Sequence, residues 1–203
     1  IDTKSDGAIA FTGEKKAVAR EPDTIQWLDG DRLLVANEGD YKGGSRSFTI
    51  FARSGEVLHE SGTDFEQRAA QAGHYPDKRS KSKGIEPEGA EVKSFGDTNY
   101  MFIMAERASL VGVYKDTGAA PEFSQLLPAG LSPEGIIAIP SRNLLAVANE
   151  VDLGEDGGVR SHVTLYSYAE GVAAYPTIVS GRDETDAPLG WGAMSGLTAD
   201  PEK

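Results

Sequence analysis

Acidic residues recur at matching places in three parts of the chain. One set follows a proline at the start of a predicted strand, and it consists of Asp23, Glu88 and Glu134. A second set directly follows an apolar strand, and it consists of Glu38, Glu106 and Glu150. Carboxylates that converge from neighbouring repeats repel one another unless a cation lies among them, and Ca²⁺ prefers oxygen ligands. The pattern predicts a shared calcium or substrate site, with Glu38, Glu88, Glu106, Glu134 and Glu150 as candidate metal ligands.

A purely structural role for these acids remains open at this point. Each carboxylate could instead accept hydrogen bonds from backbone N–H groups of the adjacent turn. Asn37 and Asn149 precede two of the acids, and we interpret them as turn-stabilising amides rather than ligands. The loop 152–157 is rich in Gly and acids, but it lacks the alternating acids of an EF-hand and is a weak metal signal.

A basic run, Lys78–Lys83, lies in a long insertion that extends from about residue 62 to residue 84. Long loops in compact domains are typically functional or disordered. The run could receive an anionic ligand, a phosphorylated small molecule in particular, although a charge run on a loop is commonly only solvated. Our candidate substrate-binding residues are Arg79, Lys81, Lys83 and Arg107.

Signatures of nucleophilic hydrolases do not occur in the sequence. It has no Gly-x-Ser-x-Gly elbow, no His-Glu-x-x-His and no phosphate-cradling Gly-x-x-x-x-Gly-Lys. His59, His74 and His162 are scattered without partners in sequence, so we name no catalytic residue. Metal-assisted attack by water is the hydrolytic route that these residues leave open.

The acids belong to a unit of about 45 residues that occurs three times. Each copy has a Pro-acid turn, an apolar strand that ends at a glutamate, and a second strand that ends in aromatic residues. Short strands in such a repeat are typical of β-propeller blades, so we predict an all-β fold. The pair Asp29-Gly30 predicts a tight hairpin turn with a positive φ. The one helix we expect, Asp64–Ala72, would be short and peripheral.

The repeats also predict the domain organisation. We expect partial propeller blades over residues 1–180, and a linker with the start of a further blade over residues 181–203, where a fourth unit begins at Gly190. Propellers usually have about 4–8 blades, so three units and a partial fourth predict a fragment of a larger protein. The alternative is a small self-contained sandwich.

Composition excludes several classes of protein. The 203 residues carry a net charge of −12, which argues against nucleic-acid binding and fits either solubility or cation binding. Cysteine is absent, so disulfides, zinc-thiolate sites and cysteine nucleophiles are excluded. No apolar run approaches the length of a membrane span, and the oligomeric state is left open.

Five motifs occur in an order that resembles the choice-of-anchor I family of exported bacterial propeller proteins, often described as alkaline phosphatase-like. The motifs are Leu34–Asp40, Lys83–Ala90, Ala105–Arg107, Ser132–Ile136 and Val147–Glu150. The tail Trp191–Leu197 is similar to the start of a phytase-like, "esterase-like" propeller domain. The resemblance implies a secreted, periplasmic or cell-surface protein. β-Propeller phytases hold substrate phosphates with calcium among axial acids, and only the acidic strand ends match that arrangement here.

Two hypotheses about function follow. The first is metal-assisted phosphoester hydrolysis of the phytase-like kind, which would make the protein a phosphoric ester hydrolase. The second is a non-catalytic surface or ligand-binding propeller scaffold, in which the repeated acids serve turns.

Overall fold

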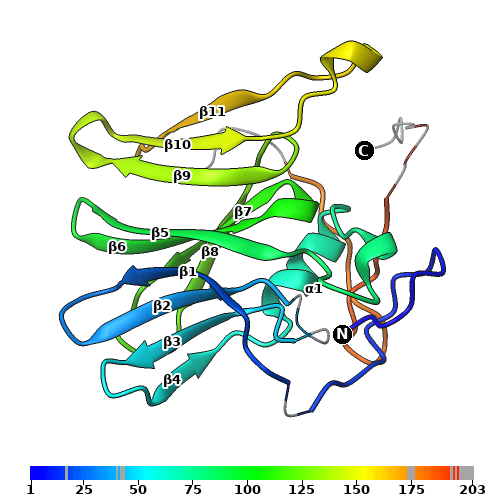
Figure 1. The fold of residues 1–203 in the computed structure, drawn as a ribbon, viewed down its shortest axis with the longest axis horizontal. Coiled ribbons are helices and arrows are strands. Elements are labelled where there is room, and N and C mark those ends of the chain that lie inside the picture. Colours follow the sequence, from blue (N-terminus) through cyan, green and yellow to red (C-terminus); the bar gives the residue numbers. More distant parts are fainter. Residues whose placement is uncertain are drawn as a thin grey trace, which may run out of the picture.

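A computed structural model describes residues 1–16, 18–39, 41, 44–172, 177–192, 194 and 196. It confirms the all-β fold, with three antiparallel sheets that we call blades 1, 2 and 3 (Figure 1). Blade 1 contains β1 (Pro22–Trp27), β2 (Arg32–Asn37), β3 (Phe48–Ala52) and β4 (Val57–Glu60). Blade 2 contains β5 (Pro87–Phe95), β6 (Thr98–Ala105), β7 (Leu110–Lys115) and β8 (Glu122–Pro128). Blade 3 contains β9 (Pro133–Ile139), β10 (Leu144–Asn149) and β11 (His162–Ser167).

The first strands of the blades lie side by side. β5 contacts both β1 and β9, whereas β4 and β11 lie at the lower and upper ends of the view (Figure 1). Each blade therefore runs outward from an inner strand in chain order, as propeller blades do. The described blades do not close into a ring, and their three sheets do not form the alternative two-sheet sandwich.

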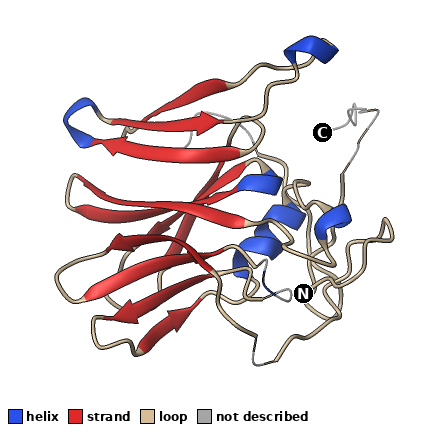
Figure 2. Ribbon diagram, viewed as in Figure 1, coloured by secondary structure: helices blue, strands red, loops and turns tan. Residues whose placement is uncertain are grey.

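Short helices gather near one end of the strands (Figure 2). They include α1 (Asp64–Gln71) and the 3₁₀ turns η2 (Asp77–Arg79) and η3 (Glu106–Ala108), while η4 (Pro140–Arg142) and η5 (Gly154–Asp156) lie in blade 3. The expected helix is confirmed, but its peripheral placement is wrong. Phe65 and Ala69 of α1 are fully buried in a core, because this short helix closes the end of the space between blades 1 and 2.

Alternating residues of the middle strands fill much of two apolar cores between the blades. The core between blades 1 and 2 includes Leu34, Phe48, Phe65, Met101 and Ile103. The core between blades 2 and 3 includes Phe102, Met104, Val111, Leu145 and Val147. The middle strands of blade 2 thus contribute to both cores, which is why their sequence reads as a continuous apolar run.

The first hairpin turn forms by a different interaction from the one that the sequence predicts. The Asp29-Gly30 hairpin forms, but Gly30 has no positive φ. Instead, the Asp29 carboxylate accepts the N–H groups of Asp31 and Arg32 at 2.8 and 2.9 Å, so a side chain shapes the turn.

The predicted fourth unit lies partly outside the described residues (193, 195 and 197–203). Within its described part, Trp191 donates a hydrogen bond to the carbonyl of Gln71 on α1 at 2.7 Å.

Candidate functional site

The repeated sequence places its acids at equivalent positions in the three blades. In each blade the proline of the Pro-acid turn pairs with the last residue of the next strand, and the pairs are Pro22 with Asn37, Pro87 with Ala105, and Pro133 with Asn149. The glutamate after that strand then donates its N–H to the carbonyl of the residue before the proline. These hydrogen bonds run from Glu38 to Glu21 (3.0 Å), from Glu106 to Glu86 (3.0 Å) and from Glu150 to Ser132 (2.9 Å).

A β-bulge follows each of these prolines. The register between the inner strand and its neighbour shifts there in all three blades, and Asp23, Glu88 and Glu134 are among the residues left out of the pairing. Bulges redirect side chains and are common beside functional sites. Glu86 and Ser132, each directly before a proline, adopt left-handed φ values of 59° and 51°, which non-glycine residues seldom do. The bulges and the left-handed residues therefore set the direction in which these acidic side chains leave the backbone.

Five carboxylates lie close together at the end of blades 2 and 3 where β5 and β9 begin. We call them the glutamate cluster: Glu86, Glu88, Glu106, Glu134 and Glu150. They form two groups of three, Glu86–Glu88–Glu106 and Glu106–Glu134–Glu150. Within each group, one carboxylate oxygen per residue lies within 4.8 Å of the others. Glu106 belongs to both groups and is almost fully buried. The geometry suits a cation with several oxygen ligands.

Crowding changes the protonation of the cluster. Burial, followed by a hydrogen bond to Glu106 and the charges of Glu106 and Glu134, raises the pKa of Glu88 to about 8. Burial and the neighbouring Glu150 likewise raise the pKa of Glu134. Since the pKa of Glu88 lies above its usual 4.5, the stability that its proton contributes is lost as the pH rises through about 8. Near neutral pH the cluster holds a proton that a cation could replace.

Glu86 is the point where the basic residues meet the cluster. Its buried carboxylate accepts Arg79 at 2.7 Å, Lys83 at 2.8 Å and Arg107 at 3.2 Å. Burial alone would raise the pKa of Glu86, but hydrogen bonds from Lys83 and Arg79 and the charge of Arg107 lower it below the usual value. Glu86 therefore stays ionised and holds three cationic side chains beside the cluster.

The structure brings together most, but not all, of the residues proposed from sequence. Glu88, Glu106, Glu134 and Glu150 lie in the cluster. Glu38 belongs to neither group of three, but Lys83 links it to the cluster by pairing with both Glu38 and Glu86. Arg79, Lys83 and Arg107 contact Glu86, whereas Lys81 is exposed and has no ion pair among the described residues. The metal and substrate roles of these residues stay predictions.

Sequence reasoning missed Glu86. It occupies the position before the proline, and the three repeats carry Glu21, Glu86 and Ser132 there. The position could have been found from the repeat, because the residue before a Pro-acid turn comes close to the following glutamate through the hydrogen bonds given above. The repeat could not predict that three cationic side chains would contact Glu86, since two of them come from the 62–84 insertion.

Asn37 and Asn149 act within the sheets rather than in turns. Asn37 donates to the hydroxyl of Thr49 on β3 at 2.9 Å, and Asn149 donates to the hydroxyl of Thr164 on β11 at 3.0 Å. Both side chains thus join the second and third strands of their blades.

In the loop 152–157, the carboxylate of Asp152 contacts only nearby residues of the same region. Asp152 accepts the N–H of Gly154 at 2.8 Å and pairs with Arg160 at 3.4 Å. His162 lies in the same region, and its Nδ1 is 2.8 Å from the carbonyl of Arg160. These residues therefore lie outside the glutamate cluster.

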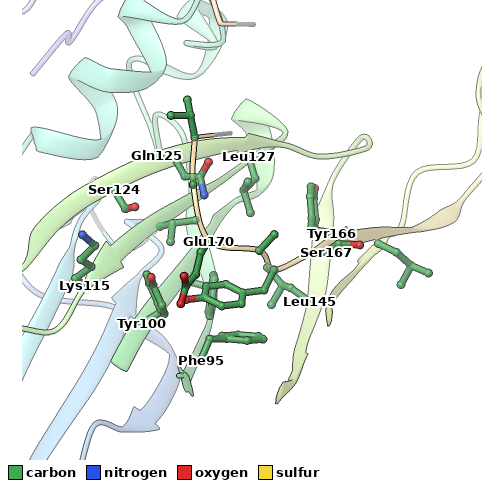
Figure 3. A pocket seen from close by; sticks show the side chains of 17 residues that line it. Phe95, Tyr100, Lys115, Ser124, Gln125, Leu127, Leu145, Tyr166, Ser167 and Glu170 are labelled. Carbon is green, nitrogen blue, oxygen red and sulfur yellow. The ribbon is translucent and has the colours of Figure 1, made fainter. Parts of the chain in front are cut away.

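A separate cavity of about 650 Å³ opens between blades 2 and 3 (Figure 3). Its floor is apolar and includes Phe95, Leu127 and Leu145, while Lys115 and Glu170 contribute polar groups. No residue of the glutamate cluster lines it. The cavity is therefore a feature distinct from the acidic site.

Of the comparisons with known proteins, the one with family models agrees with the motifs. No curated protein matches the chain. No helix in the described part of the chain is long and apolar enough to cross a membrane. Choice-of-anchor domains are typical of exported or surface-associated bacterial proteins. Residues 40–119, which include β3 to β7 and three glutamates of the cluster, match the family model of the choice-of-anchor I domain, as the motifs predicted.

Proposed function

We propose that this chain is a propeller-type module of an exported or surface-associated bacterial protein and that its glutamate cluster binds a divalent cation, with Ca²⁺ as the expected ion. The observation that carries the proposal is the pair of three-carboxylate groups joined by Glu106. Arg79, Lys83 and Arg107 offset part of the negative charge, but five carboxylates at this spacing outnumber them, and a cation would relieve the remaining repulsion.

The donor set fits a hard cation. Every candidate ligand is a carboxylate oxygen, the type that Ca²⁺ prefers, and none is a soft sulfur or an imidazole. One oxygen of Glu88, Oε2, is buried without a hydrogen-bond partner. A buried polar atom without a partner is unfavourable, and a bound cation would satisfy it.

Surrounding contacts hold the cluster in place. The bulges fix Glu88 and Glu134, and the ion pairs of Glu86 tie the cluster to the insertion. Arg107 also contacts Glu106 at 2.7 Å. Ligands positioned in this way lose little conformational freedom when a cation binds.

We expect calcium to stabilise the folded chain. A ligand that binds only the folded state at a concentration 100 times its dissociation constant adds about 2.7 kcal/mol. The measurement is the thermal unfolding midpoint in CaCl₂ and in NaCl of equal ionic strength. A midpoint that is the same in both salts would contradict the proposal.

A second candidate function is the binding and hydrolysis of a phosphorylated small molecule at the same site. The observation that favours it is Arg107, whose side chain is 40% exposed while its guanidinium contacts both Glu86 and Glu106. An arginine at this place could hold phosphate oxygens beside the cluster. A bound Ca²⁺ would supply positive charge for the phosphate and for the activation of water.

The hydrolytic activity predicts phosphate release that depends on calcium. The assay uses phytate and an aryl phosphate, with Ca²⁺ or with EDTA, and the variant Arg107→Met as a comparison. We expect turnover only with Ca²⁺ and a loss in the variant. Calcium binding without any turnover would leave a non-catalytic cation-binding scaffold as the function.

A further inference from the structure

Strands β7 and β8 of blade 2 are packed differently on their two sides. On the side of blade 1 they are covered by α1, because Phe65 lies edge-on to Tyr114 of β7 and Arg68 lies over the ring of Phe123 of β8 at 3.7 Å. On the side of blade 3 the same strands face the cavity of about 650 Å³, with β10 and β11 opposite them. Sites for small ligands have volumes of about 300–1,000 Å³, so this cavity is large enough for one.

Contacts between its lining residues hold the walls of the cavity in place. Tyr166 on β11 donates a hydrogen bond to the carbonyl of Pro128 at the end of β8 at 2.6 Å, which links the two opposite walls. The ring of Tyr168 stacks on Phe95 at 4.8 Å and lies 6.0 Å from the ring of Tyr100. These three rings form an aromatic wall that is ordered without a ligand, so binding would cost little conformational freedom there.

Polar side chains from three parts of the chain also line the cavity. They are Lys115 of β7, Ser124 and Gln125 of β8, and Ser167 and Glu170 at and after the end of β11 (Figure 3). Lys115 forms one long ion pair, with Glu122 at 3.8 Å. The side chains of the other four make no hydrogen bond or ion pair with the rest of the described chain. Their hydrogen-bonding capacity is therefore open to a ligand.

These groups together suit a ligand that is neutral and rich in hydroxyl groups. Lys115 and Glu170 carry opposite charges, so the cavity as a whole favours neither an anion nor a cation. Hydroxyl groups can accept from the lysine, donate to the carboxylate, and do both with the serine and glutamine side chains. The aromatic wall supplies apolar surface, on which the C–H face of a sugar ring can pack.

We propose that this cavity binds a neutral saccharide of one or two sugar rings. An aromatic anion would pair with Lys115, but Glu170 would repel it and the serine and glutamine side chains would stay without partners. No residue of the glutamate cluster lines the cavity. Saccharide binding is therefore a function in addition to cation binding, and it does not depend on a bound cation.

The test is saturation-transfer NMR of the full 203-residue chain in EDTA, with cellobiose, maltose and N,N′-diacetylchitobiose as separate probes. We expect at least one probe to receive saturation, most strongly at the ring C–H groups that face the aromatic wall. Its dissociation constant should be the same at about 0.05 M and about 0.5 M NaCl, because salt screens only interactions between charges. No transfer to any of the three sugars would overturn the proposal. Tighter, salt-dependent binding of 1-naphthoate would also overturn it, in favour of a site for aromatic anions.

Two variants place the bound sugar in this cavity. Gln125→Ala removes one hydrogen-bonding side chain and should raise the dissociation constant about 10-fold. Ser124→Trp puts a large ring at an exposed lining position and should abolish binding. The matched control Ser54→Trp changes an exposed serine in the turn between β3 and β4, and it should leave the affinity unchanged. Circular dichroism shows whether each variant is folded, and the small Gln125→Ala change keeps the test valid if the tryptophan disturbs β8. Sugar binding that is unchanged in folded Gln125→Ala and Ser124→Trp would overturn the proposal.

Discussion

Glu66→Ala should lower the free energy of unfolding by about 3–5 kcal/mol, the loss expected when one partner of a buried ion pair is removed. Glu66 on α1 and Arg46 before β3 are almost fully buried, with Arg46 Nε 3.0 Å from Glu66 Oε1. Arg46 also donates to the carbonyls of Ser80 at 2.9 Å and Asp2 at 3.1 Å. The substitution would leave its guanidinium buried without a counter-charge, and the measurement is urea unfolding followed by circular dichroism.

Two further variants show whether the loss comes from the buried charge. Arg46→Met combined with Glu66→Leu removes both charges and should recover much of the stability, because no unpaired ion then remains. Glu14→Ala removes an exposed ion-pair partner of Lys16, and its effect should stay within about 1 kcal/mol. A Glu66→Ala loss no larger than that of Glu14→Ala would show that this pair does not hold the insertion to blade 1.

Glu106→Gln has the largest expected effect on the acidic site. Glu106 is the residue common to both carboxylate groups, so its neutralisation removes a charged ligand from each. The number of charged ligands shifts calcium affinity over several orders of magnitude. We therefore expect the dissociation constant for Ca²⁺ to rise about 100-fold in a calorimetric titration, while the size-matched amide preserves the fold.

The matched control is Glu122→Gln on β8. Its carboxylate is 64% exposed and lies 3.8 Å from Lys115, away from the cluster. The net charge changes by the same amount in both variants, so any general electrostatic effect is shared. Equal losses in Glu106→Gln and Glu122→Gln would mean that calcium responds to overall charge and not to the cluster.

The repeat predicted the blades and the acids because both depend on local pattern. A Pro-acid turn, an apolar strand and a closing glutamate recur with fixed spacing, so equivalent backbone contacts follow for Glu38, Glu106 and Glu150. The same reasoning could not show that Glu38 would pair with a lysine instead of joining either group of three carboxylates. Lys83 binds it, and Lys83 comes from the insertion, whose path depends on packing far along the chain.

Long-range packing also explains why the sequence did not predict the buried ion pair of Arg46 and Glu66. Arg46 and Glu66 each read as a surface charge, and only the approach of α1 to blade 1 buries them together. The helix itself was predictable from its apolar spacing, but its burial was not. Similarly, the turn at Asp29 follows a side-chain hydrogen bond rather than the glycine that suggested it.

Calcium titration by calorimetry near pH 7, in two buffers of different ionisation enthalpy, shows whether the glutamate cluster binds Ca²⁺. Because the pKa of Glu88 is raised to about 8, we expect Ca²⁺ to bind and to displace a proton. The apparent heat should therefore differ between the buffers, and the affinity should increase from pH 6 to pH 8. The absence of a binding heat at millimolar Ca²⁺ in both buffers would contradict a cation site in the glutamate cluster.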